Sequence, residues 1–204
     1  MIKILFFILV PFILFSIQSA DDFIEINKLN DHVKLDIRYA TKNNFLKEAV
    51  YPSARCFLRY KAAVKIDSIQ KELEQLGLGL KIFDGYRPLS VQKKMWEVMP
   101  DDRYVANPAS GSRHNRGAAV DLTLVDSTGK DLPMPTEYDS FAEQAHHNFI
   151  LNNKQKMLNR WILKTIMEKY GFTPISSEWW HYDLKGWKDY PVEDLSFEEI
   201  DRRH

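Results

Sequence analysis

Two histidines and two carboxylates in this chain have the spacing of a mononuclear metal site. His114 precedes Asp121 by seven positions, with Gly117 between them, and far downstream Glu178 precedes His181 by three. Two histidines and one aspartate make a set of three protein ligands. Zinc sites with three protein ligands keep the fourth position for water, which is the catalytic arrangement rather than the closed structural one.

The elements around these residues must bring them together. Val120, Leu122 and Leu124 alternate as in a strand, so Asp121 points to the opposite face and can meet a ligand. His114 comes from the end of a polar, turn-rich loop just before this strand. The small residues that follow His114 permit close backbone approach beside a metal or a substrate.

The second histidine lies in a predicted strand over residues 172–184. On strict alternation Trp179, His181 and Asp183 share one face of this strand and Glu178 points to the other. Glu178 and His181 can therefore serve one site only if the backbone bends or bulges between them.

Arg87 is a candidate cation for the same site. A short apolar strand runs into a turn at residues 84–88, and Pro88 restricts Arg87 to extended geometry, which would hold its side chain in a fixed direction. The alternative is a surface arginine that pairs with Asp84.

Other residues with metal-binding or nucleophilic side chains fit these roles less well. His146 and His147 fall in a helical pattern that begins at Phe141, and adjacent helical residues point about 100° apart, so the two cannot easily face one ion. We interpret them as surface or pocket-edge residues. Cys56 is the only cysteine, so no internal disulfide can form, and it is expected to be a small buried residue.

The remaining periodicity predicts the scaffold. A strand is expected near residues 33–37, followed by an amphipathic helix over 62–76 that ends at Gly77. Ser90 is a candidate N-cap for a helix that ends before Pro100. A further helix carries residues 158–166 and ends by Gly171, and a surface helix is expected near 195–200.

The first twenty residues have the pattern of a signal peptide. Lys3 precedes an apolar run over residues 4–17, and small and polar residues close the segment before Asp21. The alternative is an anchor that stays attached, although the run is short for a membrane span and contains Pro11. We expect export to the periplasm or the medium, with residues 1–20 as the signal peptide, residues 21–204 as one domain, and no stable membrane span after cleavage.

The charge balance limits the partners. Removal of the signal segment takes away one basic and no acidic residue, so 27 basic and 28 acidic residues remain of the original 28 and 28. A near-neutral chain argues against nucleic acid as a partner. The sequence does not determine the oligomeric state.

The motifs together resemble the D-alanyl-D-alanine dipeptidase family of zinc peptidases. The resemblance covers most of the chain after the first twenty-odd residues and rests on the Ser-x-His-x-x-Gly-x-Ala-x-Asp pattern of residues 112–121 and the Glu-Trp-Trp-His of residues 178–181. Further matching stretches are residues 36–41, 44–45, 54–56, 84–88 and 169–172. We expect an α+β fold, with helices packed on a mostly antiparallel sheet and the zinc site at the sheet edge.

The resemblance implies the roles of individual residues. One zinc ion per chain would be held by His114, Asp121 and His181, while Glu178 would be the general base that takes a proton from a metal-activated water. Arg87 would stabilise the tetrahedral intermediate. The substrate-binding residues would be Ser112 and Asp139, and the small dipeptide D-alanyl-D-alanine would be the substrate.

The chain departs from the family pattern in one loop. Residues 134–136 read Met-Pro-Thr where the family usually has Met-Gly-Thr, so the loop that carries Asp139 is expected to differ in shape. Two other functions stay open. One is a D,D-carboxypeptidase or peptidoglycan endopeptidase with the same zinc site, and the other is an exported zinc-binding module without turnover, which would need neither Glu178 nor Arg87.

Overall fold

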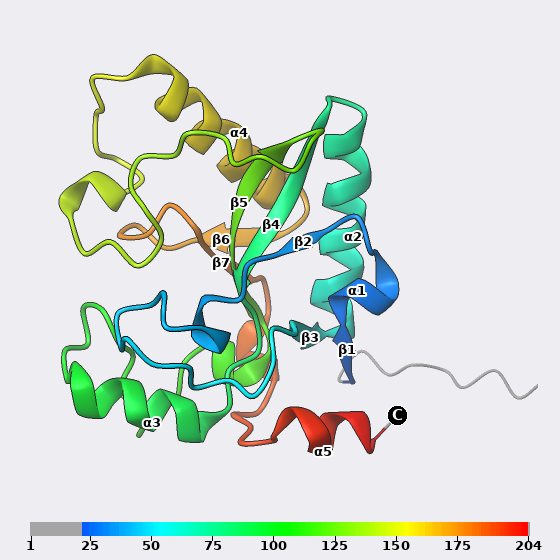
Figure 1. Ribbon diagram of the computed structural model, residues 1–204, viewed down its shortest axis with the longest axis vertical. Helices are drawn as coiled ribbons and strands as arrows, with labels where there is room; N and C mark the ends of the chain where they lie inside the picture. The colour runs from blue at the N-terminus through cyan, green and yellow to red at the C-terminus, as the bar shows by residue number, and fades with distance from the viewer. Residues whose placement is uncertain (1–21, 204) are drawn as a thin grey trace, which may run out of the picture.

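The computed structural model describes residues 22–203, so the predicted signal peptide lies outside the described residues. Figure 1 shows a twisted sheet with the helices and loops around it. The helices are α1 (Ile26–Leu29), α2 (Tyr60–Glu74), α3 (Leu89–Val98), α4 (Lys154–Lys169) and α5 (Phe197–Asp201). The strands are β1 (Phe23–Glu25), β2 (Lys34–Leu35), β3 (Phe57–Arg59), β4 (Leu78–Asp84), β5 (Ala119–Asp126), β6 (Phe172–Pro174) and β7 (His181–Leu184).

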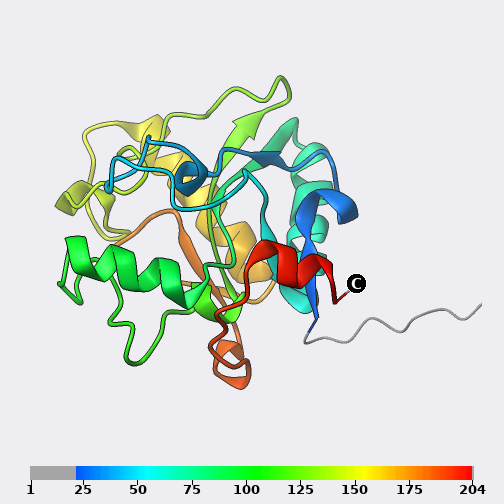
Figure 2. The same ribbon diagram turned by 60° about the horizontal axis from the view of Figure 1, so that its bottom comes forward.

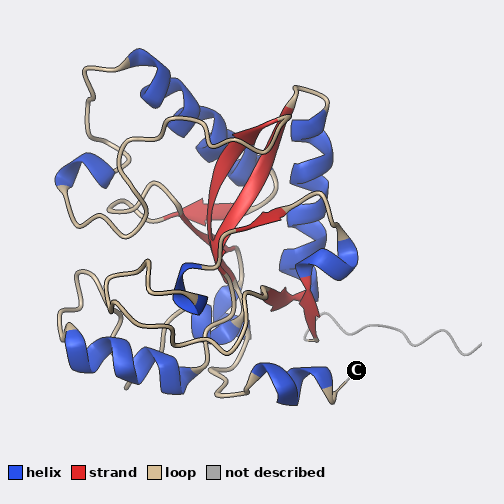
Figure 3. Ribbon diagram, in the orientation of Figure 1, coloured by secondary structure: helices blue, strands red, loops and turns tan. Residues whose placement is uncertain are grey.

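The main sheet has five strands in the order β2-β4-β5-β7-β6. Only the β2–β4 pair is parallel, and the other three pairs are antiparallel. Strands β1 and β3 form a separate antiparallel pair. The predicted α+β class with a mostly antiparallel sheet is therefore confirmed, and Figure 3 shows that long loops rather than helices fill much of the space beside the strands.

Two long helices pack along the sheet. Helix α2 contacts β4, and α4 contacts β5 and β6. Both helices bury one stripe of apolar side chains, such as Ile66 and Leu73 in α2 and Leu163 in α4, which is the pattern that the sequence predicts. Figures 1 and 2 place α3 and α5 at the end of the sheet where β4 finishes and β5 starts.

Two predictions about the C-terminal half were wrong in detail. The helix expected from Phe141 is only a short 3-10 turn over Glu143–Ala145, and His146 has extended backbone. The strand expected over 172–184 is broken into β6 and β7 by a loop at residues 175–180. Because Glu178 lies on the loop and His181 begins β7, the two residues do not have to follow the alternation of side chains along one strand.

Smaller differences concern the helix ends. Pro88 rather than Ser90 is the N-cap residue of α3, and the Ser90 amide instead donates to Asp194 Oδ1 at 2.7 Å. Helix α5 is held by a capping box at Ser196, and it is not merely a surface helix, because Phe197 and Ile200 are buried.

Candidate active site

The three predicted metal ligands meet at the end of the β5–β7 ladder. Asp121 on β5 and His181 on β7 are cross-strand partners. His114 lies on the 3-10 turn His114–Arg116, and the chain then reverses at Gly117, whose φ is +66°. A Cβ at Gly117 would lie 2.3 Å from a ring carbon of Phe23, so only glycine fits at this reversal. Both strands lie in the interior of the sheet, and the site opens where the β7 ladder begins.

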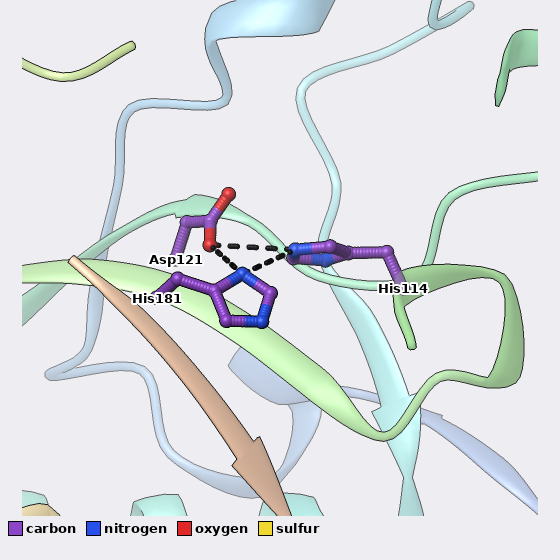
Figure 4. A group of neighbouring side chains, drawn as sticks. All are labelled: His114, Asp121 and His181. Atoms are coloured by element: carbon purple, nitrogen blue, oxygen red, sulfur yellow. Dashed lines mark hydrogen bonds and ion pairs between the residues drawn. The ribbon is translucent and has the colours of Figure 1, made fainter. Parts of the chain in front are cut away.

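The donor atoms of the three residues converge, as Figure 4 shows. Asp121 Oδ1 lies 2.9 Å from His181 Nδ1 and 3.3 Å from His114 Nε2, and the two ring nitrogens are 3.1 Å apart. All three side chains are buried. They form a group of possible metal ligands within the described residues, with the donor atoms within 4.8 Å of one another.

Each imidazole has a hydrogen-bond acceptor at its other nitrogen. His114 Nδ1 donates to the Gly85 carbonyl at 2.8 Å, and His181 Nε2 donates to Asp183 Oδ1 at 2.9 Å. These acceptors assign the ring protons, so a lone pair on each ring points at the shared space. Two lone pairs and a carboxylate oxygen that converge in a buried site need a cation, and this N₂O donor set suits zinc.

Positive charge around Asp121 keeps its carboxyl group ionised. Burial raises the pKa of Asp121, but His114 and His181 lower it more, so this pKa lies well below its usual range. Burial lowers the pKa of His181, while hydrogen bonds to Asp121 and Asp183 raise it to about 10. The pocket therefore stabilises an ionised carboxylate beside positive charge.

Tyr138 is a residue that the sequence analysis missed. Its hydroxyl donates to Asp121 Oδ2 at 2.9 Å, which leaves Oδ1 to face the two histidines. The Tyr138 ring is buried and stacks on Phe83 with a centroid distance of 4.7 Å. In the sequence Tyr138 stands out only as the neighbour of Asp139, and no local pattern pairs it with Asp121.

The donor atoms lie in the wall of a cavity of about 290 Å³. Its lining comes from the loop before β3, the turn after β4, α3, the region between α3 and β5, β5 itself, the loop after β5, and the start of β7 with the loop before it. The lining residues with polar side chains near the donors are Tyr39, Arg87, Ser112, Arg113, Asp139 and Glu178. All four predicted catalytic and substrate-binding residues thus reach the cavity that the metal donors line.

Glu178 lies beside the metal donors. Its Oε2 atom is 3.8 Å from His181 Nδ1, the nitrogen that faces the shared space. Burial raises the pKa of the Glu178 carboxyl. A raised pKa makes the carboxylate a stronger base, which suits a group that accepts a proton and then returns it.

Arg87 is held rigidly in the cavity wall. Its Nε and Nη2 donate to Asp84 Oδ2 at 3.1 and 2.7 Å, and its Nη1 donates to Gln92 Oε1 at 2.8 Å. Asp84 is fully buried and also accepts from the Tyr51 hydroxyl at 2.7 Å. The pairing with Asp84 that the sequence offered as an alternative exists, but it is buried rather than on the surface. It fixes the direction of the guanidinium.

Asp139 and Ser112 lie on two other loops of the cavity. Asp139 has a φ of +59°, and its Oδ2 accepts from the Tyr39 hydroxyl at 2.9 Å. Burial first, and then repulsion by Asp121, raise the pKa of Asp139 to about 8. The Ser112 hydroxyl accepts from the Asn115 amide at 3.2 Å.

The loop that contains Pro135, where the chain departs from the family pattern, is held by hydrogen bonds on both sides of this residue. The Asn159 side chain on α4 donates to the Pro133 carbonyl at 2.8 Å, and the Trp179 indole donates to Thr136 Oγ1 at 2.9 Å. These contacts tie the loop to α4 and to the loop that carries Glu178. Asp139 lines the cavity with proline at position 135.

The other candidate residues lie apart from the metal donors. His147 is half-buried against Tyr182 with a ring-centroid distance of 6.0 Å, and neither of the tandem histidines belongs to the ligand group. Cys56 is buried, as expected, and burial raises the pKa of its thiol.

Several known proteins with similar sequences are described as D-alanyl-D-alanine dipeptidases. The family model for D-ala-D-ala dipeptidases matches residues 19–200. A D-alanyl-D-alanine dipeptidase of Escherichia coli is 35% identical over 177 residues, covering 86% of this chain and 91% of that protein. A D-alanyl-D-alanine dipeptidase of Enterococcus faecium is 34% identical over 189 residues, covering 78% and 93%.

A solved structure also aligns with the chain. It is a vancomycin resistance D,D-pentapeptidase VanY mutant in complex with Zn(II), with 16% identity and a TM-score of 0.41, covering 74% of this chain and 86% of that one.

Proposed function

The chain belongs to the D-alanyl-D-alanine dipeptidase family, and from this premise we propose how its own residues divide the work of the reaction. The protein is a zinc metallopeptidase that hydrolyses the D-alanyl-D-alanine dipeptide. The observation that carries this function is the convergence of His114, Asp121 and His181 in the wall of a cavity.

His114 Nε2, Asp121 Oδ1 and His181 Nδ1, the three atoms that face one another, would hold the zinc ion. When bound, zinc supplies the Lewis acidity that lowers the pKa of water and polarises a carbonyl. The Gly85 carbonyl and the Tyr138 hydroxyl hold the opposite ends of His114 and Asp121, so these two donor atoms keep their direction.

Glu178 is the general base. Its carboxylate takes the proton of the attacking water and delivers it to the leaving amine. Two observations support this role: its Oε2 lies 3.8 Å from His181 Nδ1, and burial raises its pKa.

Arg87 stabilises the negative charge that develops on the carbonyl oxygen. Asp84 and Gln92 fix its guanidinium before substrate binds, so little reorganisation is needed during the reaction. A surface arginine would lose most of this effect to solvent screening.

Asp139 and Ser112 bind the substrate. A dipeptide carries a free ammonium group one residue before the scissile bond, and the Asp139 carboxylate can pair with it in a closed pocket. An N-acylated substrate would leave that carboxylate without its partner, and this selects for the free dipeptide. Ser112 contributes a hydroxyl to the same cavity.

The decisive experiment compares substrates of different length. The zinc-loaded protein is incubated with D-alanyl-D-alanine, its N-acetylated form and a D-alanyl-ended tripeptide, and released D-alanine is counted. We expect cleavage of the free dipeptide alone. Comparable kcat/KM for the N-acetylated substrate would instead make the protein a D,D-carboxypeptidase, and no release from any substrate would favour a zinc-binding module without turnover.

We also propose that the enzyme acts outside the cytoplasm. The support is the apolar run over residues 4–17 with its small residues before Asp21. In the part of the chain that the structure describes, no helix has the length and apolarity of a membrane span. The intact mass of protein recovered from the periplasm or medium should correspond to residues 21–204, and a full-length mass in the membrane fraction would favour the retained anchor.

A further inference from the structure

Asp183 is a buried carboxylate that none of the roles above uses as more than a hydrogen-bond acceptor. It lies two residues after His181 on β7, and the two side chains share one face of the strand. Its Oδ1 accepts from His181 Nε2 at 2.9 Å, and its Oδ2 lies 3.1 Å from Arg113 Nε in an ion pair. Only 5% of the residue is exposed.

Asp183 does not belong to the group of metal donors. His181 turns Nδ1 towards Asp121 and His114, and it turns Nε2 towards Asp183. The two nitrogens lie on different sides of the imidazole ring, so Asp183 holds the ring from the side away from the metal. A carboxylate in this position fixes the tautomer and raises the basicity of the ligating nitrogen.

Arg113 completes the arrangement from the rim of the cavity. Besides its ion pair with Asp183, its guanidinium carbon lies 5.1 Å from the centroid of the Trp187 ring. Its side chain is 41% exposed. A buried carboxylate without a cation would be costly, and Arg113 supplies the compensating charge. Arg113 also directly precedes His114, so one turn carries a zinc ligand and the partner of Asp183.

We propose that Asp183 is a positioning residue for the zinc site and that Arg113 acts through it. Asp183 holds the His181 ring in one orientation by accepting from Nε2, and Arg113 holds the Asp183 carboxylate in place for that hydrogen bond. The pair therefore sets zinc affinity without ligating zinc. This inference rests on the proposed zinc site, but zinc binding can be measured without any turnover.

The first test measures zinc affinity by competition with a chromophoric chelator. Asp183→Asn keeps an acceptor oxygen but loses the charge, so we expect zinc to bind about tenfold more weakly. Asp183→Ala removes the acceptor, and a loss approaching about 100-fold is expected. Asp67→Asn is the matched control, because Asp67 on α2 pairs with Lys71 and has the same change in charge. Zinc affinities of both Asp183 variants within twofold of that control would overturn the proposal.

The second test observes the imidazole proton itself. In the zinc-loaded protein, the Nε2 proton of His181 should give a slowly exchanging nitrogen-15-coupled NMR signal that Asp183→Asn shifts and Asp183→Ala loses. Unchanged exchange in Asp183→Asn would contradict the role of Asp183. This readout stays available if Asp183→Ala fails to fold, and it is independent of substrate specificity.

The third test asks whether Arg113 acts through Asp183. Arg113→Gln should weaken zinc binding several-fold in the wild-type background, and Arg113→Lys should restore part of the loss because it restores the charge. In the Asp183→Asn background the same change should have a smaller effect, because the charged carboxylate is already absent. Equal effects in both backgrounds, or an effect on KM with unchanged zinc affinity, would refute the link and make Arg113 a separate contact.

Discussion

Glu178 lies on the loop just before β7, and this placement lets its carboxylate and the His181 ring face one cavity. The loop also explains why the residue is suited to proton transfer. It is buried enough for its pKa to rise, yet close to the nitrogen that faces the metal donors. At the scale of single residues, the site therefore depends on the direction of each side chain as well as on its chemical type.

We predict that Glu178→Gln separates chemistry from metal binding. Glutamine has nearly the same shape but cannot accept the proton of the attacking water, so kcat should fall by about 10²-fold or more while zinc content stays at one per chain. Steady-state kinetics and metal analysis of one preparation test this. Near-normal turnover in the variant would mean that Glu178 is not the base.

Asp139→Asn should lower the activity of the protein and raise its stability. Asparagine tolerates the left-handed backbone at this position and removes the carboxyl group whose pKa burial raises to about 8. We expect the variant to lose most of its kcat/KM for free D-alanyl-D-alanine, because the partner of the substrate ammonium is gone. An unchanged preference for free over N-acetylated dipeptide would exclude Asp139 as the selectivity residue.

The stability effect of Asp139→Asn has a defined pH dependence in the zinc-free protein. Below pH ~4 the carboxyl is protonated in both folded and unfolded chains, so it makes no difference. Between about 4 and 8 only the unfolded chain loses the proton, so wild-type stability falls relative to the variant by at most about 1.4 kcal/mol per pH unit. Denaturant titrations of both proteins at several pH values should show that the difference between their free energies of unfolding grows with pH and levels off above pH ~8.

At the scale of elements, the end of β4 controls the His114 ligand. The Gly85 carbonyl that follows β4 accepts from His114 Nδ1, and a Cβ at Gly85 would lie 2.6 Å from Cys56 Sγ and 2.9 Å from the Phe57 carbonyl oxygen. The backbone of β3 thus limits this position to glycine. The packing of two strands that contribute no zinc ligand decides which nitrogen of His114 is available.

Gly85→Ala should therefore weaken zinc binding by displacing the backbone at the end of β4. We expect a loss of about 1–3 kcal/mol in the free energy of unfolding from overpacking, together with about tenfold weaker zinc binding because the carbonyl moves. Cys56→Ala is the control, since it makes space at the same place without displacing the carbonyl. Wild-type zinc affinity in Gly85→Ala would show that this acceptor does not position His114.

For the whole molecule, zinc links two segments that are distant in sequence, residues 114–121 and the start of β7. The turn before β5, β5 itself and the start of β7 each supply one ligand. Zinc that binds only the folded chain stabilises it by about 4 kcal/mol when free zinc is 1,000 times its Kd. The binding energy of the metal is in this sense part of the folding energy.

Removal of zinc should lower the thermal midpoint of the wild-type protein. For a domain of this size, about 4 kcal/mol corresponds to roughly 10 °C. His114→Ala, Asp121→Ala and His181→Ala should each lose zinc, because three ligands leave no spare donor, and their midpoints should no longer respond to zinc or chelator. Calorimetry with and without chelator measures this. Stoichiometric zinc in His181→Ala would refute the ligand assignment.

The sequence by itself determined much of the scaffold and the ligand set. The periodicity of residues 62–76 and 120–125 predicted α2 and β5, because a long stripe of apolar residues leaves a clear signal in the chain. The resemblance carried by residues 112–121 and 178–181 identified His114, Asp121 and His181. These signals are local, so they can be recognised in the sequence without knowledge of the fold.

Only the tertiary structure decided how these residues act together. The break between β6 and β7 follows from packing and strand pairing, which override the local preference of residues 175–180 for a continuous strand. The contacts of Tyr138 with Asp121 and of Asp84 with Arg87 and Tyr51 depend on loops that meet in space. Such hydrogen bonds leave no periodic trace in a sequence, because buried polar groups find partners wherever the fold brings them. The directions of the donor atoms were therefore settled by the folded chain.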